Sequence, residues 1–223
     1  MTYDFDTPVD RSGTYSLKWE EAGDALPMWV ADMEFQTAPQ IRAALQQRLD
    51  HGIFGYSIVP PAWNQAYVDW WHRRHNLDID PESLVFSTGV VPAISSMVRK
   101  LTTANENVLI QTPVYNIFFN SIINNGCRVL ESPLEYDGSE HYSINWADLE
   151  SKLADPQTTL MILCNPHNPV GRIWDRDTLA RIGELCWNHH VTVISDEIHC
   201  DLTDPGYDYV PFASVNEQCA MTP

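Results

Sequence analysis

The segment TTLMILCNPHNPVG, residues 158–171, gives the clearest indication of the fold in this sequence. It begins as a mostly apolar run that ends at Cys164, and it continues into two Asn-Pro pairs and Gly171. A short apolar run bounded by turn-forming residues predicts a buried strand. One Asn-Pro pair is enough to end a strand, so the second pair, Asn168-Pro169, suggests a further role for this turn.

Strands and helices are predicted to alternate on both sides of this segment. Short apolar runs are separated by helical patterns of about ten to fifteen residues, which indicates an α/β domain with a largely parallel sheet flanked by helices. The predicted strands are 83–87, 107–111, 127–132, 159–164 and 191–196, and the helices between them are 91–103, 114–125, 146–154 and 176–189, the last capped by Asp175.

Two more helices are predicted before this alternating series. The first covers 38–51, with Thr37 as its cap and Gly52 as its terminator. The second covers 62–75 and carries His72 and His75 one turn apart, which we interpret as solvated surface residues.

The composition argues against several classes of protein. Thirteen Lys and Arg against thirty Asp and Glu give a formal charge of −17, which disfavours a nucleic-acid partner. The sequence has no apolar run near the ~18 residues that a membrane span needs. The polar N-terminus does not resemble a signal peptide, so we expect a cytoplasmic protein.

The five cysteines are interpreted as small core residues in a reducing compartment. Their number is odd and no CxxC pair occurs, which argues against a disulfide framework or a zinc site. They are Cys127, Cys164, Cys186, Cys200 and Cys219.

The loops that follow the strands are the expected place for a ligand, because open parallel sheets bind ligands beyond the carboxyl ends of their strands. The first such loop, STGVVPAI at 87–94, leads into a helix. Its backbone N–H groups at Gly89, Val90 and Val91 could hold a phosphate at the positive end of the helix dipole. The alternative is an ordinary strand–helix turn, since no Walker or GxGxxG pattern is present.

Asp196 ends the very apolar strand in VISDEIHCD, 193–201. A carboxylate there is poorly solvated and needs a partner: a protonated ring nitrogen, a metal, or the N–H groups of the next turn. Glu197, His199 and Asp201 are near in sequence, but their spacing is not that of a known ligand set, so we expect no metal site.

Tyr115 and Asn168 complete the candidate site. Tyr115 follows the strand 107–111, where its ring could lie against a planar ligand or pack in the core. Asn168 could donate to a ligand oxygen or only stabilise its turn. A phosphate cradle, an aromatic plate, an amide donor and a buried carboxylate together match pyridoxal 5′-phosphate.

At this point the sequence resembles the fold-type I pyridoxal-phosphate enzymes, the class I/II aminotransferase superfamily, and within it the cystathionine β-lyase (C–S lyase) branch. The stretches that carry the resemblance are MWVADMEF (28–35), FGYS (54–57), TPVYNIF (112–118), CNPHNPVGR (164–172) and SDEIHCDL (195–202). The resemblance implies residues 1–50 as an N-terminal segment and helix, and residues 51–223 as an incomplete large cofactor-binding domain. It also implies that the small C-terminal domain is absent from this sequence.

The resemblance assigns roles to the candidate cofactor residues. Asp196 would pair with the pyridinium nitrogen, Asn168 would donate to the ring oxygen and Tyr115 would stack on the pyridine face. His199 takes the place of the Tyr with which many aminotransferases also bind the ring oxygen. The N–H groups of Gly89, Val90 and Val91 would hold the phosphate.

The resemblance also implies a homodimer and a pocket for an amino-acid substrate. Tyr56 would act at the active site of a neighbouring subunit, close to the phosphate. Trp29 and the main chain around Ala31 would line the substrate pocket.

The lysine that such enzymes use for the Schiff base is not identified in this sequence. The only lysines are Lys18, Lys100 and Lys152, and none has the sequence context of the family's lysine. The resemblance therefore predicts that this lysine lies just beyond residue 223.

Three functions follow as hypotheses. The first is a carbon–sulfur β-lyase that acts on cystathionine or cysteine-type amino acids and gives pyruvate, ammonia and a thiol. The alternative is an aminotransferase on the same scaffold. The third, of a different class, is a regulatory protein that keeps the scaffold without catalysis.

Overall fold

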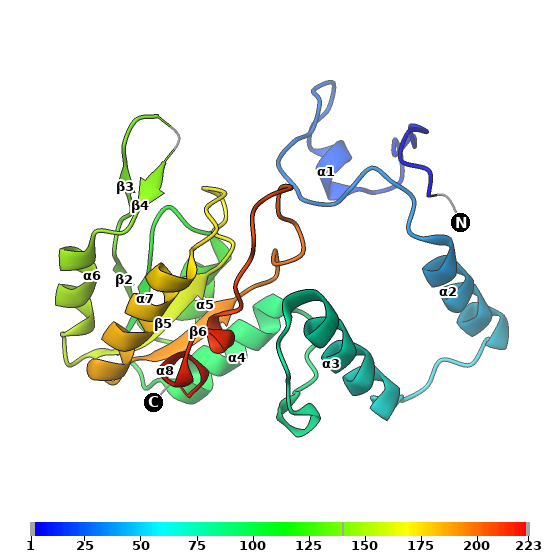
Figure 1. Ribbon diagram of the computed structural model, residues 1–223. Helices are drawn as coiled ribbons and strands as arrows, with labels where there is room; N and C mark the ends of the chain where they lie inside the picture. Colours follow the sequence, from blue (N-terminus) through cyan, green and yellow to red (C-terminus); the bar gives the residue numbers. More distant parts are fainter. Residues whose placement is uncertain (1–2, 140, 222–223) are drawn as a thin grey trace. The chain divides into compact units, whose positions relative to one another are not determined.

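The computed structural model describes residues 3–139 and 141–221. The chain divides into two compact units, Met1–Ile58 and Val59–Pro223, each described here by itself (Figure 1). We call them the N-terminal unit and the sheet unit. The boundary at residue 50 that the resemblance implies stays a prediction.

A four-stranded parallel sheet forms the centre of the sheet unit (Figure 1). Its strand order is β2-β1-β5-β6, with β1 Asn107–Ile110, β2 Arg128–Glu131, β5 Thr158–Cys164 and β6 Thr192–Asp196. Each of these strands is joined to the next by a segment that contains a helix. The predicted α/β class with a largely parallel sheet flanked by helices is confirmed.

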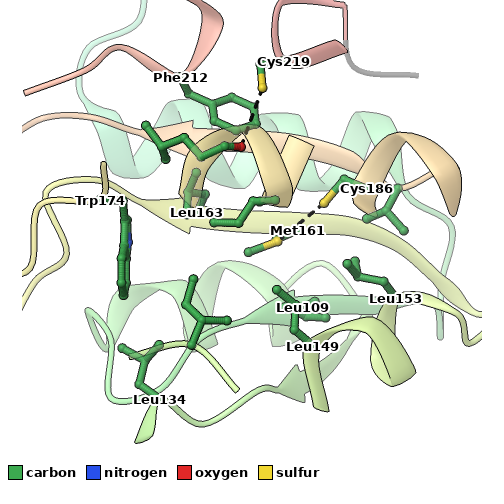
Figure 2. Packing of buried hydrophobic residues seen from close by; sticks show 14 residues of the cluster. Leu109, Leu134, Leu149, Leu153, Met161, Leu163, Trp174, Cys186, Phe212 and Cys219 are labelled. Carbon is green, nitrogen blue, oxygen red and sulfur yellow. Dashed lines mark hydrogen bonds between the residues drawn. The ribbon is translucent and has the colours of Figure 1, made fainter. Parts of the chain in front are cut away.

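Successive side chains of a strand point to opposite sides of the sheet, and helices cover the central strands on both faces. On one face, Val108 and Ile110 pack with α4 (Val90–Leu101) and α5 (Ile117–Ile123). On the other face, Leu109, Met161 and Leu163 pack with α6 (Trp146–Leu153) and α7 (Arg176–Asn188), as Figure 2 shows. Two apolar layers therefore fix the strands whose carboxyl ends carry the candidate site.

The end of the described chain packs closely on α7. The short helices η2 (Phe212–Ser214) and α8 (Glu217–Ala220) bring Phe212 and Cys219 into the second layer (Figure 2). A Cβ atom at Gly183 of α7 would lie 2.3 Å from Cys219 Sγ, so only glycine allows this approach without a shift. The helix begins as predicted, because Asp175 accepts a hydrogen bond from the Thr178 N–H at 2.8 Å.

The five cysteines are all buried, with free thiols. The prediction that they are core residues is confirmed.

The described part of the N-terminal unit contains two helices, α1 Leu17–Glu20 and α2 Pro39–His51. Gly52 ends α2 in the left-handed region at φ 72°, as predicted. Thr37 does not cap it: the N-cap is Ala38, which has no side-chain oxygen, and Pro39 starts the helix.

Two differences from the predicted elements lie in the sheet unit. After α3 (Pro61–His75) and a 3-10 turn at Pro81–Ser83, residues 84–87 form no strand, because none of the described strands pairs with them. Val85 is 88% exposed there. A small hairpin, β3 Glu135–Tyr136 and β4 Tyr142–Ser143, was not predicted because its strands are only two residues long. Among the described helices, none is long and apolar enough to cross a membrane.

Candidate active site

The two Asn-Pro pairs after β5 have different surroundings. Asn165 is completely buried, and its side chain donates to the Val210 carbonyl at 3.2 Å and accepts from the Trp174 N–H at 3.2 Å. Its own N–H donates to the carbonyl of Asp196 at 3.0 Å. Asn165 therefore fastens the loop to its neighbours, and its complete burial keeps its amide from a ligand.

Asn168 is only half-buried, and its side-chain amide makes no hydrogen bond to any residue that the structure describes. Its backbone N–H points to the Cys164 sulfur at 3.4 Å, which holds the turn above the end of β5. Asn168 and His199 both line a hollow of about 500 Å³. The second Asn-Pro turn thus presents an unused amide to an open space.

Asp196 is the last residue of β6 and is 7% exposed. Its Cα lies opposite Cys164 in the parallel pairing of β5 and β6. The carboxylate accepts the Ile198 N–H at 3.2 Å, and no described Lys, Arg or His forms an ion pair with it. Burial raises its pKa, against the opposing effects of the Ile198 N–H and of His199. A cation placed at this carboxylate would relieve that cost.

A second hollow, of about 380 Å³, is lined by both Asp196 and Val90. Val90 begins α4, and Gly89 is its N-cap in extended conformation. Within the described part of the chain, the N–H groups of Gly89, Val90 and Val91 donate no hydrogen bond. Such free N–H groups at a helix start are available to an anion.

The remaining candidates lie elsewhere in the sheet unit or belong to the N-terminal unit. Tyr115 is 37% exposed, packs edge-on against Phe118 at 5.9 Å and lines neither hollow. Tyr56, Trp29 and Ala31 belong to the N-terminal unit, where all three are exposed. The structure thus places Val90 with Asp196 and Asn168 with His199, and the site as a whole stays a prediction.

The interpretation of His75 as a solvated residue is wrong. Its side chain is 7% exposed, and its Nε2 lies 3.0 Å from Asp201 Oδ1. The ring of Trp71, one turn earlier, lies 4.8 Å from it. A Trp four residues before a His on a helix was the available signal, because such residues share one face. His72 is solvated as expected, with 63% of its side chain exposed.

Glu197, next to Asp196, has a structural role that the sequence did not reveal. Its carboxylate accepts from the Ser195 hydroxyl at 2.9 Å and from the Phe212 N–H at 2.8 Å. Burial raises its pKa. It ties the turn after β6 to the segment near Phe212.

One group of potential metal ligands occurs among the described residues. The ligand atoms of His75, Cys200 and Asp201 lie within 4.8 Å of one another. However, both oxygens of Asp201 already interact with side-chain N–H donors, Trp70 and His75 among them. Burial and the neighbouring carboxylates raise the pKa of Cys200 to about 11, so its thiol stays protonated. The expectation of no metal site stays a prediction.

The three lysines either form ion pairs or are exposed. Lys18 is buried and pairs with Glu34 at 2.7 Å. Lys152 pairs with Asp148 at 2.7 Å, and Lys100 is exposed on α4. None of the three lines either of the two hollows.

Comparison with known proteins agrees with the family resemblance of the sequence. The model of the family "Aminotransferase class I and II" matches residues 27–220. The chain is 48% identical to cystathionine beta-lyase PatB of Bacillus subtilis and covers 57% of its length, with 97% of this chain aligned. It is 36% identical to the protein MalY of Escherichia coli, aligning 96% of this chain and 56% of that one.

A solved structure agrees with these sequence matches. Cystalysin from Treponema denticola, which contains a pyridoxal 5′-phosphate cofactor, superposes with a TM-score of 0.93 at 36% identity. The superposition covers 100% of this chain and 58% of cystalysin. The chain therefore spans a little more than half the length of the proteins that it matches.

Proposed function

The chain belongs to the aminotransferase class I and II family, and from this premise we propose that the whole protein is a pyridoxal-phosphate-dependent carbon–sulfur β-lyase. Its substrates would be cystathionine or other cysteine-type amino acids. The observation that carries the proposal is the buried Asp196, which shares a hollow with Val90 in a chain 48% identical to a cystathionine beta-lyase.

The cofactor fits the residues in charge and hydrogen-bonding capacity. Asp196 has a raised pKa and no ion pair with any residue that the structure describes, so a protonated pyridine nitrogen would complete its surroundings. The free N–H groups at the start of α4 would bind the phosphate without a lysine or arginine, which suits a chain of net charge −17. The unused amide of Asn168 and the ring of His199 would bind the ring oxygen, and Tyr115 would stack on the ring.

The reaction removes the α-proton of the substrate and then breaks the bond between Cβ and sulfur. When bound, pyridoxal 5′-phosphate withdraws electrons from the α-carbon and so makes its proton acidic. The thiolate leaves with the electron pair of the C–S bond and takes up a proton, and water converts the remaining fragment to pyruvate and ammonia. Asp196 contributes by keeping a positive charge on the ring nitrogen, because a carboxylate beside a cation stabilises it.

Parts of this proposal lie outside the sheet unit. We propose that Tyr56, which is fully exposed, serves the active site of a second copy in a homodimer. Trp29 and the main chain at Ala31 would face the amino-acid substrate. The Schiff-base lysine would come from outside residues 1–223, and the cytoplasmic location stays a prediction.

An assay of the products tests the proposal. The full protein, loaded with pyridoxal 5′-phosphate, is incubated with cystathionine, and pyruvate and free thiol are measured. We expect both products in equal amounts. Rapid amino transfer to a keto acid without pyruvate would instead support the aminotransferase alternative, which the family match also favours.

Asn168→Ala tests the assignment of the ring oxygen. We expect a shifted absorption band of the bound cofactor and weaker binding, because the amide donor is lost. An unchanged spectrum and affinity would contradict the assignment. Lys100→Ala, an exposed change on α4, is the control and should leave both unchanged.

A further inference from the structure

Helix α3 and the turn after β6 meet at one carboxylate, that of Asp201. Trp70 Nε1 donates to its Oδ2 at 2.9 Å, and His75 Nε2 lies 3.0 Å from its Oδ1. Arg74 Nε lies 3.5 Å from the same Oδ1. Three side chains of one helix therefore converge on a residue more than a hundred positions away in the sequence.

The turn that carries Asp201 is short and hydrogen-bonded within itself. The Cys200 N–H donates to the Glu197 carbonyl at 3.0 Å, and the Leu202 N–H donates to the His199 carbonyl at 2.9 Å. The Ile198 N–H donates to the carboxylate of Asp196. A displacement of Asp201 would therefore be transmitted to Asp196 and His199 through a few linked bonds.

Helix α3 also forms a wall of the hollow in which Asp196 lies. Tyr67, Trp70 and Trp71 line this hollow together with Asp196 and Val90. The rings of Tyr67 and Trp71 are 6.0 Å apart, and the ring of His75 continues this row at 4.8 Å from Trp71. The position of α3 against the turn thus sets the width of the space around Asp196.

We propose that Asp201 is a positioning residue, which fastens α3 to the turn after β6 and so holds Asp196 in place for the ring nitrogen of the cofactor. The inference rests on the proposed function, because the position of Asp196 matters here through its interaction with the bound cofactor. A hydrogen bond to an ionised carboxylate is stronger than one between neutral groups. The partly exposed carboxylate of Asp201 has three neighbouring side chains with N–H groups, those of Trp70, Arg74 and His75.

The rival role for the same residues is a metal site made of His75, Cys200 and Asp201. Both roles use Asp201, so they must be separated by experiment. The metal role requires Cys200 as a ligand, whereas the positioning role requires the donors of α3.

The test compares Asp201→Asn with a matched control, Asp78→Asn. Asp78 also pairs with a histidine of α3, His72, at 2.7 Å, but its side chain is 90% exposed and it lines none of the described hollows. Both variants are made in the full protein. Hydrogen exchange of residues 61–75 and 196–202 measures the fastening, and the dissociation constant of pyridoxal 5′-phosphate measures its consequence.

For Asp201→Asn we expect faster exchange in both segments and a dissociation constant raised at least about tenfold, because one charged acceptor is lost. The pH midpoint of the absorption band of the bound cofactor should also shift, since it reports the interaction of Asp196 with the ring. A loss of stability by itself would not move this midpoint. Asp78→Asn should change none of the three.

Two results would overturn the inference alone, and a third would overturn the proposed function with it. Unchanged cofactor binding and midpoint in Asp201→Asn, when the native protein binds normally, would remove the positioning role and leave the proposed function intact. A cobalt(II) thiolate absorption band that is lost in both Cys200→Ser and Asp201→Asn would assign the group to a metal instead. If Asp201→Asn fails to fold, Trp70→Phe, which removes one donor and keeps an aromatic side chain, should raise the dissociation constant by a smaller factor. No binding of pyridoxal 5′-phosphate by the native protein would remove the proposed function itself, and the positioning role with it.

Discussion

In the sheet unit the buried side chains are mostly aliphatic, and they form one layer on each face of the sheet. In the described part of the N-terminal unit, only Lys18 and Pro27 are buried. The apolar residues of α2 remain largely exposed, Leu45 at 65%. Polar contacts take the place of a core: Lys18 and Arg11 both pair with Glu34, and Lys18 Nζ donates to the Asp32 carbonyl at 2.8 Å.

Because of this difference, a carboxylate is destabilising in the core of the sheet unit and stabilising in the N-terminal unit. In the sheet unit a buried carboxylate such as Asp196 is costly, because none of the described residues forms an ion pair with it to offset its lost hydration. In the N-terminal unit the carboxylate of Glu34 is half-buried and has cationic partners, Lys18 and Arg11. The sheet unit should therefore respond most to lost apolar volume, and the N-terminal unit to lost charge.

The largest expected effect is that of a truncation in the sheet unit. Leu163→Ala removes a fully buried side chain of β5 and should lower the free energy of unfolding by about 2–5 kcal/mol. Urea unfolding of the full protein measures it. Leu45→Ala on α2 is the matched control and should cost less than about 0.5 kcal/mol.

An equal loss in both leucine variants would break the comparison. It would mean that the exposed face of α2 is covered in the assembled protein. The proposed homodimer supplies such a cover, and a dependence of the Leu45→Ala effect on protein concentration would identify it.

The next effect tests the buried polar residue of the doubled Asn-Pro turn. Asn165→Ala leaves the Trp174 N–H and the Val210 carbonyl without their partner in a buried place. We expect a loss of about 1–3 kcal/mol in the free energy of unfolding. Asn168→Ala, the half-exposed counterpart, should cost far less, and similar losses in both would show that Asn168 is also structural.

The sequence was sufficient for what depends on periodicity and turns. The apolar run 158–164, the cap Asp175 and the terminator Gly52 act locally, so their patterns predict the structure directly. The structure shows Asn165 held in its turn by hydrogen bonds, whereas a ligand role for Asn168 stays a prediction.

What failed depends on partners distant in the sequence. The run at 83–87 has the composition of a strand, but a strand needs a neighbour, and none of the described strands offers one. For His75 the local signal is Trp71 on the same helix face, but much of its burial comes from Asp201 and Tyr209, which lie against it from far along the chain. Contacts of this kind cannot be read from local pattern.

A smaller effect concerns the cost of the buried charge. Because burial raises the pKa of Asp196, the folded protein binds its proton more readily than the unfolded chain does. Stability is therefore lost as pH rises from the ordinary value of 3.8 through the raised pKa. Asp196→Asn, which lacks this titration, should become more stable relative to the native protein as pH rises.

Urea unfolding without cofactor, at several values between about pH 4 and about pH 8, measures this difference. Added pyridoxal 5′-phosphate should reverse it in the native protein, because a ring cation would then offset the charge. A difference that is independent of pH would show that Asp196 has a cationic partner already.

The smallest effect is the converse one in the N-terminal unit. Lys18, followed by Trp19 and Arg11, holds the pKa of Glu34 below its ordinary value of 4.5. The interactions that lower this pKa stabilise the N-terminal unit. Their contribution is fully present above pH 4.5 and is lost as pH falls through the lowered value. Glu34→Gln abolishes this contribution at neutral pH, so trypsin should cleave faster after Lys18, while Asp78→Asn should leave the rate unchanged. Because the side chains of Glu34 and Arg11 are partly exposed, added salt should raise the rate in the native protein and change it little in Glu34→Gln. Equal rates in both proteins at low salt would mean that the N-terminal unit is held by something other than its charges, and the contrast with the sheet unit would not hold.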